Sequence, residues 1–209
     1  MPAQPFTAVS GRAAAMREDN IDTDIIFPAR FLLITAKAGL GEYAFHDRRF
    51  ASDGSKVEGY VLNDSRFANA PVIVAGANFG SGSSREQAVW ALYGLGVRAV
   101  VAPSFGEIFQ SNCLRNGIVP IALDEAQVAR LMDLAEAGAE FTIDLESEQL
   151  GVDGSMLAKF TIAPERRLAL LNGWDETDQI LNQFSGDIEA FEVRQRQSQP
   201  WLHTKEFVA

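Results

Sequence analysis

The chain has 209 residues, of which 47% are hydrophobic and 22% are charged, and its formal net charge is −10. This size and composition are typical of one globular domain with a sizeable core. The acidic balance argues against nucleic-acid and anionic-membrane partners, because both require clustered Lys and Arg. The first residues show no leader pattern and no stretch is long enough to span a bilayer, so we expect a cytoplasmic protein without membrane contact.

Residues 5–14 have the pattern of a first strand, and the polar, mostly acidic residues 18–20 are typical of the turn that closes it. Asp22 and Asp24 follow. If this segment is extended, both carboxylates share one face, because side chains alternate along a strand with a period of two. Such a pair can act as a base, a metal site or an orienting partner for Arg or His. Turn formation and helix capping are the structural alternatives.

The apolar residues 31–34 lead into a glycine-rich stretch at Gly39 and Gly41, which predicts a core helix followed by a surface loop. Residues 46–70 are polar and rich in turn formers. Within them, we expect residues 60–62 to dock against the core.

The most informative stretch is 71–87, PVIVAGANFGSGSSREQ. The β-branched run at 72–75 predicts a buried strand, and the three glycines after it permit a tight loop. Ser83 and Ser84 each stand three residues before Glu or Gln, the spacing of a capping box, so we expect them to cap a helix. A strand, a glycine loop and a helix start favour anion binding, and Arg85 adds a fork suited to a carboxylate.

Three familiar loops of similar composition do not fit this stretch. A Walker loop requires Lys after Gly82, where the chain has Ser83. A dinucleotide fingerprint requires Gly at the position of Arg85, and a hydrolase elbow requires Gly at the position of Glu86. Helix capping alone, worth about 1 kcal/mol, stays open as the structural interpretation of Ser83 and Ser84.

Two further strands are predicted at 97–102 and 118–122, and the strand–helix–strand order predicts right-handed parallel crossovers. We expect Ser104 to cap the helix between them. Pro120 favours an edge position for the last strand, because it cannot donate a ladder hydrogen bond. Asp124 is expected to cap an amphipathic helix.

Alternation over 140–162 with a turn at 152–154 predicts a β-hairpin. Pro164 opens a helix that Gly173 ends, and two more helical stretches reach residue 197.

Cys113 is the one cysteine, so the chain has no intrachain disulfide. One Cys and two His do not provide the ligands of an iron–sulfur cluster. We expect Cys113 to be a free, buried thiol on a helix.

Four strings taken together resemble the mobile C-terminal domain of the aconitase superfamily. They are NIDTD at 20–24, NFGSGSSRE at 78–86, SFGEIF at 104–109 and NGIVP at 116–120. As a free-standing chain of this length, the sequence is similar to the small-subunit family of the 3-isopropylmalate dehydratases. The similarity covers nearly the whole chain, including LLNGWD at 170–175 and IEAFE at 188–192.

The resemblance implies an α/β fold, namely a swivelling β/β/α domain with a mostly parallel core sheet flanked by helices and an added β-hairpin. It implies that residues 1–209 form one aconitase-type swivel domain, with a helical tail over about 164–209.

The resemblance also implies a hydro-lyase of leucine biosynthesis that is active only in a complex. The enzyme would interconvert 2-isopropylmalate and 3-isopropylmalate, both small diacids, through isopropylmaleate. A large partner subunit would carry a [4Fe–4S] cluster, and this chain would bind no metal. The cluster would supply Lewis-acid chemistry for the hydroxyl, while a base would remove a proton next to a carboxylate.

By resemblance, Ser83 matches the serine base of the superfamily, with Ser84 and Arg85 beside it. An alkoxide is tenable only among N–H donors and positive charge, which the helix start and Arg85 provide. Asp24 matches an acid of the active site.

Substrate-binding residues also follow from the resemblance. Gly82 belongs to the substrate loop, and Arg30 stands where a second carboxylate-binding Arg is expected. Leu32, Leu33 and Ile34 fall in the specificity loop, where they would form the wall of an isopropyl pocket.

The chain departs from the family pattern at Gln87, where His is usual, and at Trp174, where a smaller apolar residue is common. A paralogous subunit acting on dimethylmalate, citraconate or homoaconitate therefore stays open as an alternative. Two non-enzymatic alternatives are a regulatory lid without chemistry of its own and an anion-binding α/β module whose serines cap a helix.

Overall fold

The structure is a computed structural model that describes residues 4–203. It contains two compact units, one ending at Gly173 and the other beginning at Trp174. The first unit is built on a seven-stranded sheet in the order β4-β3-β2-β1-β5-β6-β7.

One half of the sheet is parallel and contains β1 (Ala8–Met16), β2 (Val72–Ala75), β3 (Ala99–Ala102) and β4 (Val119–Ala122). The predicted strands and their parallel crossovers are confirmed. β4 lies at the edge of the sheet, as Pro120 indicated.

The other half of the sheet is antiparallel and contains β5 (Glu140–Asp144), β6 (Gln149–Val152) and β7 (Ser155–Lys159). The predicted hairpin is present at the β6–β7 turn, and β5 adds a third strand to it. β1 joins the two halves, because residues 8–12 pair antiparallel with β5 and residues 13–16 pair parallel with β2. The hairpin is therefore continuous with the core sheet.

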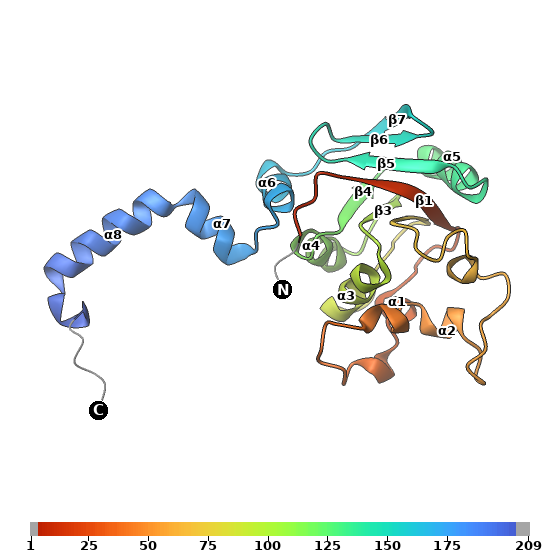
Figure 1. Cartoon of the computed structure of the whole chain (residues 1–209), viewed down its shortest axis with the longest axis horizontal. Helices are drawn as coiled ribbons and strands as arrows, with labels where there is room; N and C mark the ends of the chain where they lie inside the picture. Colours follow the sequence, from red (N-terminus) through yellow and green to blue (C-terminus); the bar gives the residue numbers. More distant parts are fainter. Residues whose placement is uncertain (1–3, 204–209) are drawn as a thin grey trace. The chain divides into compact units, whose positions relative to one another are not determined.

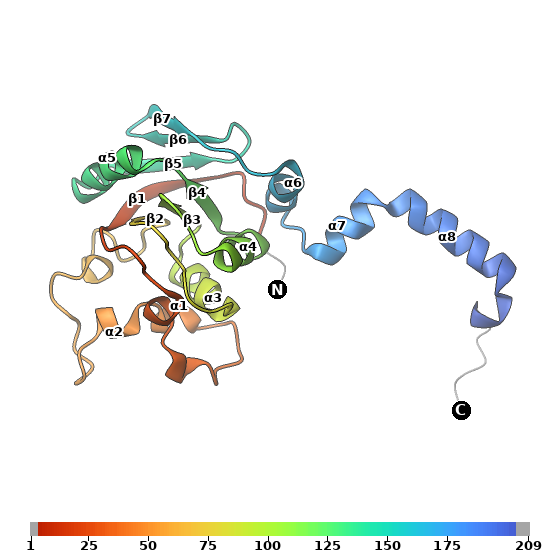
Figure 2. The same ribbon diagram turned by 180° about the vertical axis from the view of Figure 1, so that it is seen from behind.

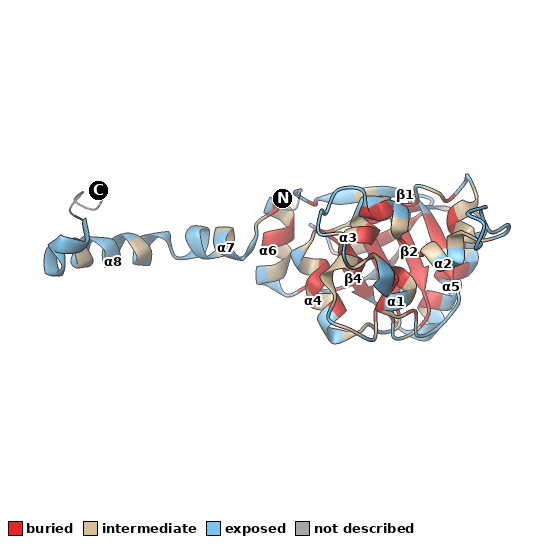
Figure 3. Ribbon diagram, turned by 90° about the horizontal axis from the view of Figure 1, so that it is seen from below, coloured by how far each residue is buried: buried red, intermediate tan, exposed pale blue. Residues whose placement is uncertain are grey.

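Helices cover both faces of the parallel strands (Figures 1 and 2). α3 (Glu86–Leu95) and α4 (Glu107–Arg115) pack on the face that carries Ala14, Ile73 and Val100. α5 (Glu125–Glu136) and the antiparallel strands pack on the opposite face, which carries Ala13 and Val101. Because side chains alternate along each strand, the sheet has a hydrophobic core on each of its faces. Full burial of one large apolar side chain in either core contributes about 1.5–3 kcal/mol to the stability of the fold. Figure 3 shows this burial along the strands and the inner sides of α3 and α4.

Short elements occupy the segment between β1 and β2. They are α1 (Thr23–Ile26), η1 (Ala29–Phe31), η2 (Leu40–Tyr43), α2 (His46–Arg49) and η3 (Val61–Asn63). The predicted core helix at 31–34 is wrong, because Leu33 is 92% exposed and only a 3₁₀ turn precedes it. Docking of residues 60–62 is confirmed by Leu62, which is 3% exposed.

The predicted helix caps divide into two groups. Asp22 and Asp124 cap α1 and α5 through side-chain acceptors, as the capping interpretation of these residues requires. The caps expected from Ser83, Ser84 and Ser104 are wrong, because α3 and α4 begin at later residues and neither has a side-chain cap. Ser104 Oγ instead accepts a hydrogen bond from the Asn78 backbone N–H at 2.9 Å.

The predicted helices after the sheet are confirmed. α6 (Pro164–Asn172) starts with proline and ends at Gly173 in the left-handed conformation. The second unit contains α7 (Glu176–Gln183), α8 (Ser185–Ser198) and η4 (Pro200–His203). None of the helices within residues 4–203 is long and apolar enough to cross a membrane.

Candidate active site

Three loops meet where the parallel strands β1, β2 and β3 end, the edge at which α/β sheets bind ligands. These loops are residues 17–22, 76–85 and 103–106. The first two are joined by backbone hydrogen bonds from Asn20 to Ala77 at 2.8 Å and from Gly80 to Ile21 at 2.7 Å. The second and third are joined by bonds from Phe79 to Ser104 and from Gly106 to Phe79. The loop that carries Ser83 is therefore held on both sides by its neighbours.

Glycine is required in this loop for two different reasons. Gly80 has a φ of 72°, and a Cβ there would lie 2.1 Å from Cγ of the buried Phe109. Gly76 has an ordinary backbone conformation, but its Cβ would lie 2.4 Å from the backbone oxygen of Glu18. Close packing against a buried ring and against a neighbouring backbone therefore explains Gly80 and Gly76.

Ser83 lies against α1. Its Oγ is 2.9 Å from Thr23 Oγ1, and its backbone N–H donates to the same oxygen at 3.1 Å. Thr23 is 1% exposed, whereas Ser83 is only half-buried. The serine hydroxyl thus has a fixed partner on the protein side and remains accessible on the other side.

Arg85 forms a bidentate ion pair with Asp24. Nη1 lies 2.6 Å from Oδ1 and Nη2 lies 2.9 Å from Oδ2. The Arg85 side chain is 24% exposed and that of Asp24 is 52% exposed. The geometry is that of two parallel N–H···O bonds, which orient the guanidinium more rigidly than one contact does. Asp24 therefore acts as an orienting partner for arginine, and Asp22 takes the separate role of helix cap.

The remaining members of the loop have different surroundings. Ser84 is exposed, and its backbone oxygen accepts a bond from Asn112 Nδ2 at 3.3 Å. Gly82 is also exposed and has a φ of 97°. Asn112 is 6% exposed, so the end of the loop is tied to the interior of α4.

Sequence reasoning missed Thr23 and Asn112 as members of this site. Thr23 stands between the two aspartates that we singled out, so the NIDTD string already contained it. Asn112 had no signal except its place next to Cys113, which we predicted to be buried. These two are the buried polar side chains that the structure shows within residues 4–203.

Arg30 belongs to a second cluster, with His46, Asp47 and Phe31. Its Nη1 lies 2.8 Å from Asp47 Oδ2, its Nη2 contacts Oδ1, and Nη2 also lies 3.1 Å from His46 Nδ1. The guanidinium lies over the Phe31 ring at 4.5 Å. Hydrogen bonding from Arg30 holds the pKa of the Asp47 carboxyl below its usual value. No hydrogen bond or ion pair within residues 4–203 joins this cluster to Ser83 or Arg85.

The three apolar residues after η1 differ in exposure. Leu32 and Ile34 are partly buried against the core, whereas Leu33 points into solvent. Farther along the same loop, Lys37 Nζ lies 4.3 Å from the centre of the Trp90 ring on α3. This cation–π contact ties the loop to the helix that follows Ser83.

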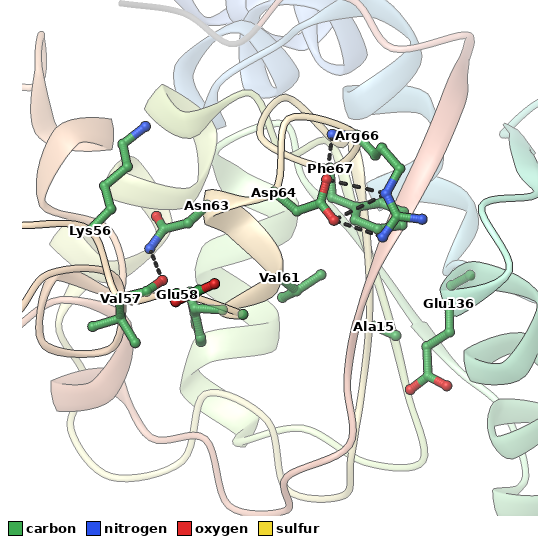
Figure 4. Close-up of a pocket in the computed structure, with 13 residues that line it drawn as sticks. Ala15, Lys56, Val57, Glu58, Val61, Asn63, Asp64, Arg66, Phe67 and Glu136 are labelled. Atoms are coloured by element: carbon green, nitrogen blue, oxygen red, sulfur yellow. Dashed lines mark hydrogen bonds and ion pairs between the residues drawn. The ribbon is translucent and has the colours of Figure 1, made fainter.

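A cavity of about 760 Å³ lies elsewhere, between residues 56–67, β1 and α5. Figure 4 shows the Arg66 guanidinium turned towards the Asp64 carboxylate and the Asn63 amide turned towards the Val57 carbonyl. None of the predicted site residues lines this cavity. Within this lining Arg66 pairs with Asp64, and Glu136 pairs with Arg17, whereas Asn63 Oδ1 is buried without a hydrogen-bond partner among the described residues.

Comparisons with known proteins agree with this architecture. The family model described as "Aconitase C-terminal domain" matches residues 3–126. The model that describes the C-terminal domain of the 3-isopropylmalate dehydratase small subunit matches residues 183–205.

Curated relatives match nearly full length. A 3-isopropylmalate dehydratase small subunit of Rhodospirillum centenum is 46% identical over 200 residues, covering 95% of this chain and 98% of the relative. That of Rhodospirillum rubrum is 44% identical over 203 residues, covering 95% and 97%.

A solved structure supports the fold. The crystal structure of a 3-isopropylmalate dehydratase chain from Methanocaldococcus jannaschii is 27% identical and superposes with a TM-score of 0.66, covering 88% of this chain and 99% of that one. Sequence, family models and fold therefore agree along the chain. The chain belongs to the family of 3-isopropylmalate dehydratase small subunits, within the aconitase superfamily.

Proposed function

We propose that this chain, together with a large subunit, interconverts 2-isopropylmalate and 3-isopropylmalate through isopropylmaleate in leucine biosynthesis. One observation carries the proposal: a chain of this family holds the Ser83 hydroxyl beside the Arg85–Asp24 pair at the ligand-binding edge of its parallel sheet. Membership among small subunits implies a large partner subunit.

In this proposal, Ser83 is the base. Each dehydration removes a proton from the carbon next to a carboxylate and the hydroxyl from the neighbouring carbon. The alkoxide Oγ takes the proton, and the electron pair of the broken C–H bond forms the alkene as the hydroxyl departs. Hydration of isopropylmaleate reverses these steps, with the hydroxyl added to the carbon that lost the proton and the proton added to the carbon that lost the hydroxyl. The charge of Arg85 and the uncapped first N–H groups of α3 favour an alkoxide at this place.

Arg85 would bind a substrate carboxylate. Asp24 accepts from Nη1 and Nη2, which leaves further N–H groups of the guanidinium to donate. Because Asp24 fixes the plane of the guanidinium, the N–H groups that remain free would already be oriented when the substrate carboxylate binds. Ser84 and Gly82 belong to the same loop. Both are exposed, so they would line the substrate site.

Arg30 would bind the second carboxylate, and its orientation is set by Asp47 and the Phe31 ring. Leu32, Leu33 and Ile34 would face the isopropyl group. Leu33 is 92% exposed and is therefore available to contact the substrate or the partner. Such a pocket discriminates by only about 1–3 kcal/mol per methylene, so dimethylmalate, citraconate and homoaconitate are tested beside isopropylmalate.

The residues of this chain do not fit an iron–sulfur cluster. Cys113 is the one thiol, it is fully buried on α4, and no group of three or more His, Cys, Asp or Glu side chains within the described residues could hold a metal. We therefore propose that the large subunit holds a [4Fe–4S] cluster, which would supply Lewis-acid chemistry for the departing hydroxyl. The proposal also keeps residues 1–209 as one swivel domain with a helical tail and places the complex in the cytoplasm.

The test is an anaerobic co-purification of the tagged chain with its large subunit, followed by an assay of alkene absorbance with 2-isopropylmalate and the three other diacids. We expect turnover of 2-isopropylmalate and its loss in Ser83→Ala, with intact partner binding. Ser155→Ala, an exposed serine on β7, is the matched control and keeps full activity.

Unchanged turnover in Ser83→Ala would refute the serine base. Turnover of another diacid alone would replace the substrate but keep the mechanism. A partner-bound complex without any turnover would favour a regulatory lid.

A further inference from the structure

The side chain of Thr23 has a position that the proposed function does not yet explain. It is 1% exposed and meets Ser83 twice, at the backbone N–H and at Oγ. A buried hydroxyl is costly unless it is hydrogen-bonded, so the identity of its partners decides its role. Both partners belong to the residue proposed as the base.

The backbone of Thr23 is fixed from both directions. Its N–H donates to the Ser81 backbone oxygen at 2.9 Å. Asp22 caps the turn, and Ile26 and Phe27 anchor it in the core with 0% exposure. The Thr23 hydroxyl therefore has little freedom to move away from Ser83.

Either hydroxyl can donate in this contact, and counting protons favours one direction. Thr23 Oγ1 accepts the Ser83 N–H and still carries one proton to donate. Within residues 4–203, Ser83 Oγ is the acceptor that this proton meets, at 2.9 Å. Ser83 as a residue is only half-buried, whereas Thr23 is 1% exposed, so an outward proton is less costly on Ser83 than an unpaired one on Thr23. The arrangement that satisfies both groups has Thr23 donating and the Ser83 proton directed out of the loop.

We propose that Thr23 is a positioning residue that donates a hydrogen bond to Ser83 Oγ and so stabilises its deprotonated form. This inference rests on the proposed base role of Ser83. A hydrogen bond to the charged form of a group favours that form, and a bond to an anionic oxygen is stronger than one between neutral groups. The same contact fixes the oxygen towards the side from which the substrate approaches.

A purely structural role predicts something different. If Thr23 only ties the loop to α1, its removal destabilises the loop and lowers activity equally at every pH. If it donates to Ser83, its removal raises the pKa of the group at position 83. The test therefore measures a titration as well as an activity.

The first experiment uses Ser83→Cys in the full chain, which introduces a thiol whose ionisation is followed by thiolate absorbance. Cys113 does not interfere, because it is fully buried and burial raises its pKa. We expect the introduced thiol to titrate below the ordinary value of about 8.5. Adding Thr23→Val raises that value by about one unit, whereas Thr23→Ser, which keeps the hydroxyl, leaves it lowered.

An ordinary or raised value in Ser83→Cys alone overturns the proposal, and so does an equal value with and without the Thr23 hydroxyl. If Thr23→Val does not fold, NMR of the unmodified chain decides. A slowly exchanging Thr23 hydroxyl proton directed at Ser83 supports the proposal, and a Ser83 hydroxyl proton directed at Thr23 overturns it.

The second experiment uses the assembled complex. We expect Thr23→Val to lower kcat by on the order of 10²-fold and to shift the acidic limb of the pH–rate profile upward, with Thr23→Ser restoring both. Loss of activity without a shift of the profile overturns the positioning role. If the Ser83→Ala complex remains active, the proposed role of Ser83 as the base is refuted. If the Ser83→Ala complex is inactive while the Thr23→Val complex has the activity and pH profile of the unmodified complex, only the inference about Thr23 is refuted.

Discussion

Gly80→Ala tests how tightly the loop that carries Ser83 is packed against α4. The new Cβ would lie 2.1 Å from Cγ and 2.3 Å from Cδ1 of Phe109 and would therefore collide with its ring. Phe109 is 1% exposed, so its ring cannot move out into solvent. Forcing extra atoms into a packed core costs about 1–3 kcal/mol. The φ of 72° adds about 1–2 kcal/mol, because a residue with a Cβ is strained there. We therefore expect a loss of about 2–5 kcal/mol in the free energy of unfolding.

Gly54→Ala is the matched control. Gly54 has a φ of 81° with nothing within 4 Å of its Cβ position, so it carries the backbone strain without the collision. The lower entropy of the unfolded chain affects both variants alike and cancels in their difference. Urea unfolding of the full chain, followed by far-UV circular dichroism, should show Gly80→Ala less stable than Gly54→Ala by about 1–3 kcal/mol. Equal stabilities would show that the loop yields to Phe109 and would refute the close packing inferred here.

Three further predictions follow from named contacts. Asp124→Ala removes the acceptor of the Gln127 N–H and should lower the free energy of unfolding by about 1 kcal/mol, measured by urea titration; no change would mean that water replaces the cap. Because Arg30 lowers the pKa of Asp47, this carboxylate contributes stability above the unfolded-state value of about 4, and the contribution is lost as the pH falls through the lowered folded-state value. The melting temperatures of Asp47→Asn and of the unmodified chain should therefore converge as the pH is lowered from 6 to 3. The difference at pH 6 should be small, because the Arg30 and Asp47 side chains are both about half exposed. Cys113 should resist alkylation in the native chain and react in urea, since it is fully buried on α4; rapid labelling of native protein would contradict that packing.

Local sequence patterns were sufficient for the regular part of the fold. The β-branched runs at 72–75 and 97–102, separated by a helix-length segment, predicted a parallel crossover because few other connections are possible. The Asp124 cap and the Pro164–Gly173 helix were also predictable, since a cap and its target lie within three or four residues of each other.

Two predictions failed for different reasons, a distant partner in one case and a very short turn in the other. Ser83 has capping spacing, but its Oγ bonds to Thr23 and the backbone of Arg85 is extended, so α3 starts at Glu86. Asp22 and Asp24 alternate as in a strand, yet the Asp22 side chain accepts the Ile25 N–H and closes a four-residue turn that is too short to show helical periodicity.

The sequence by itself determined the four parallel strands with their connecting helices, the edge position of β4, the buried thiol and the family to which the chain belongs. Only the tertiary structure decided which groups meet at the site. Ser83 and Thr23 are 60 residues apart, and Arg85 and Asp24 are 61 apart. The physical reason is that propensities and caps act over a few residues, whereas these contacts exist only once three parallel strands bring their loops to one edge of the sheet.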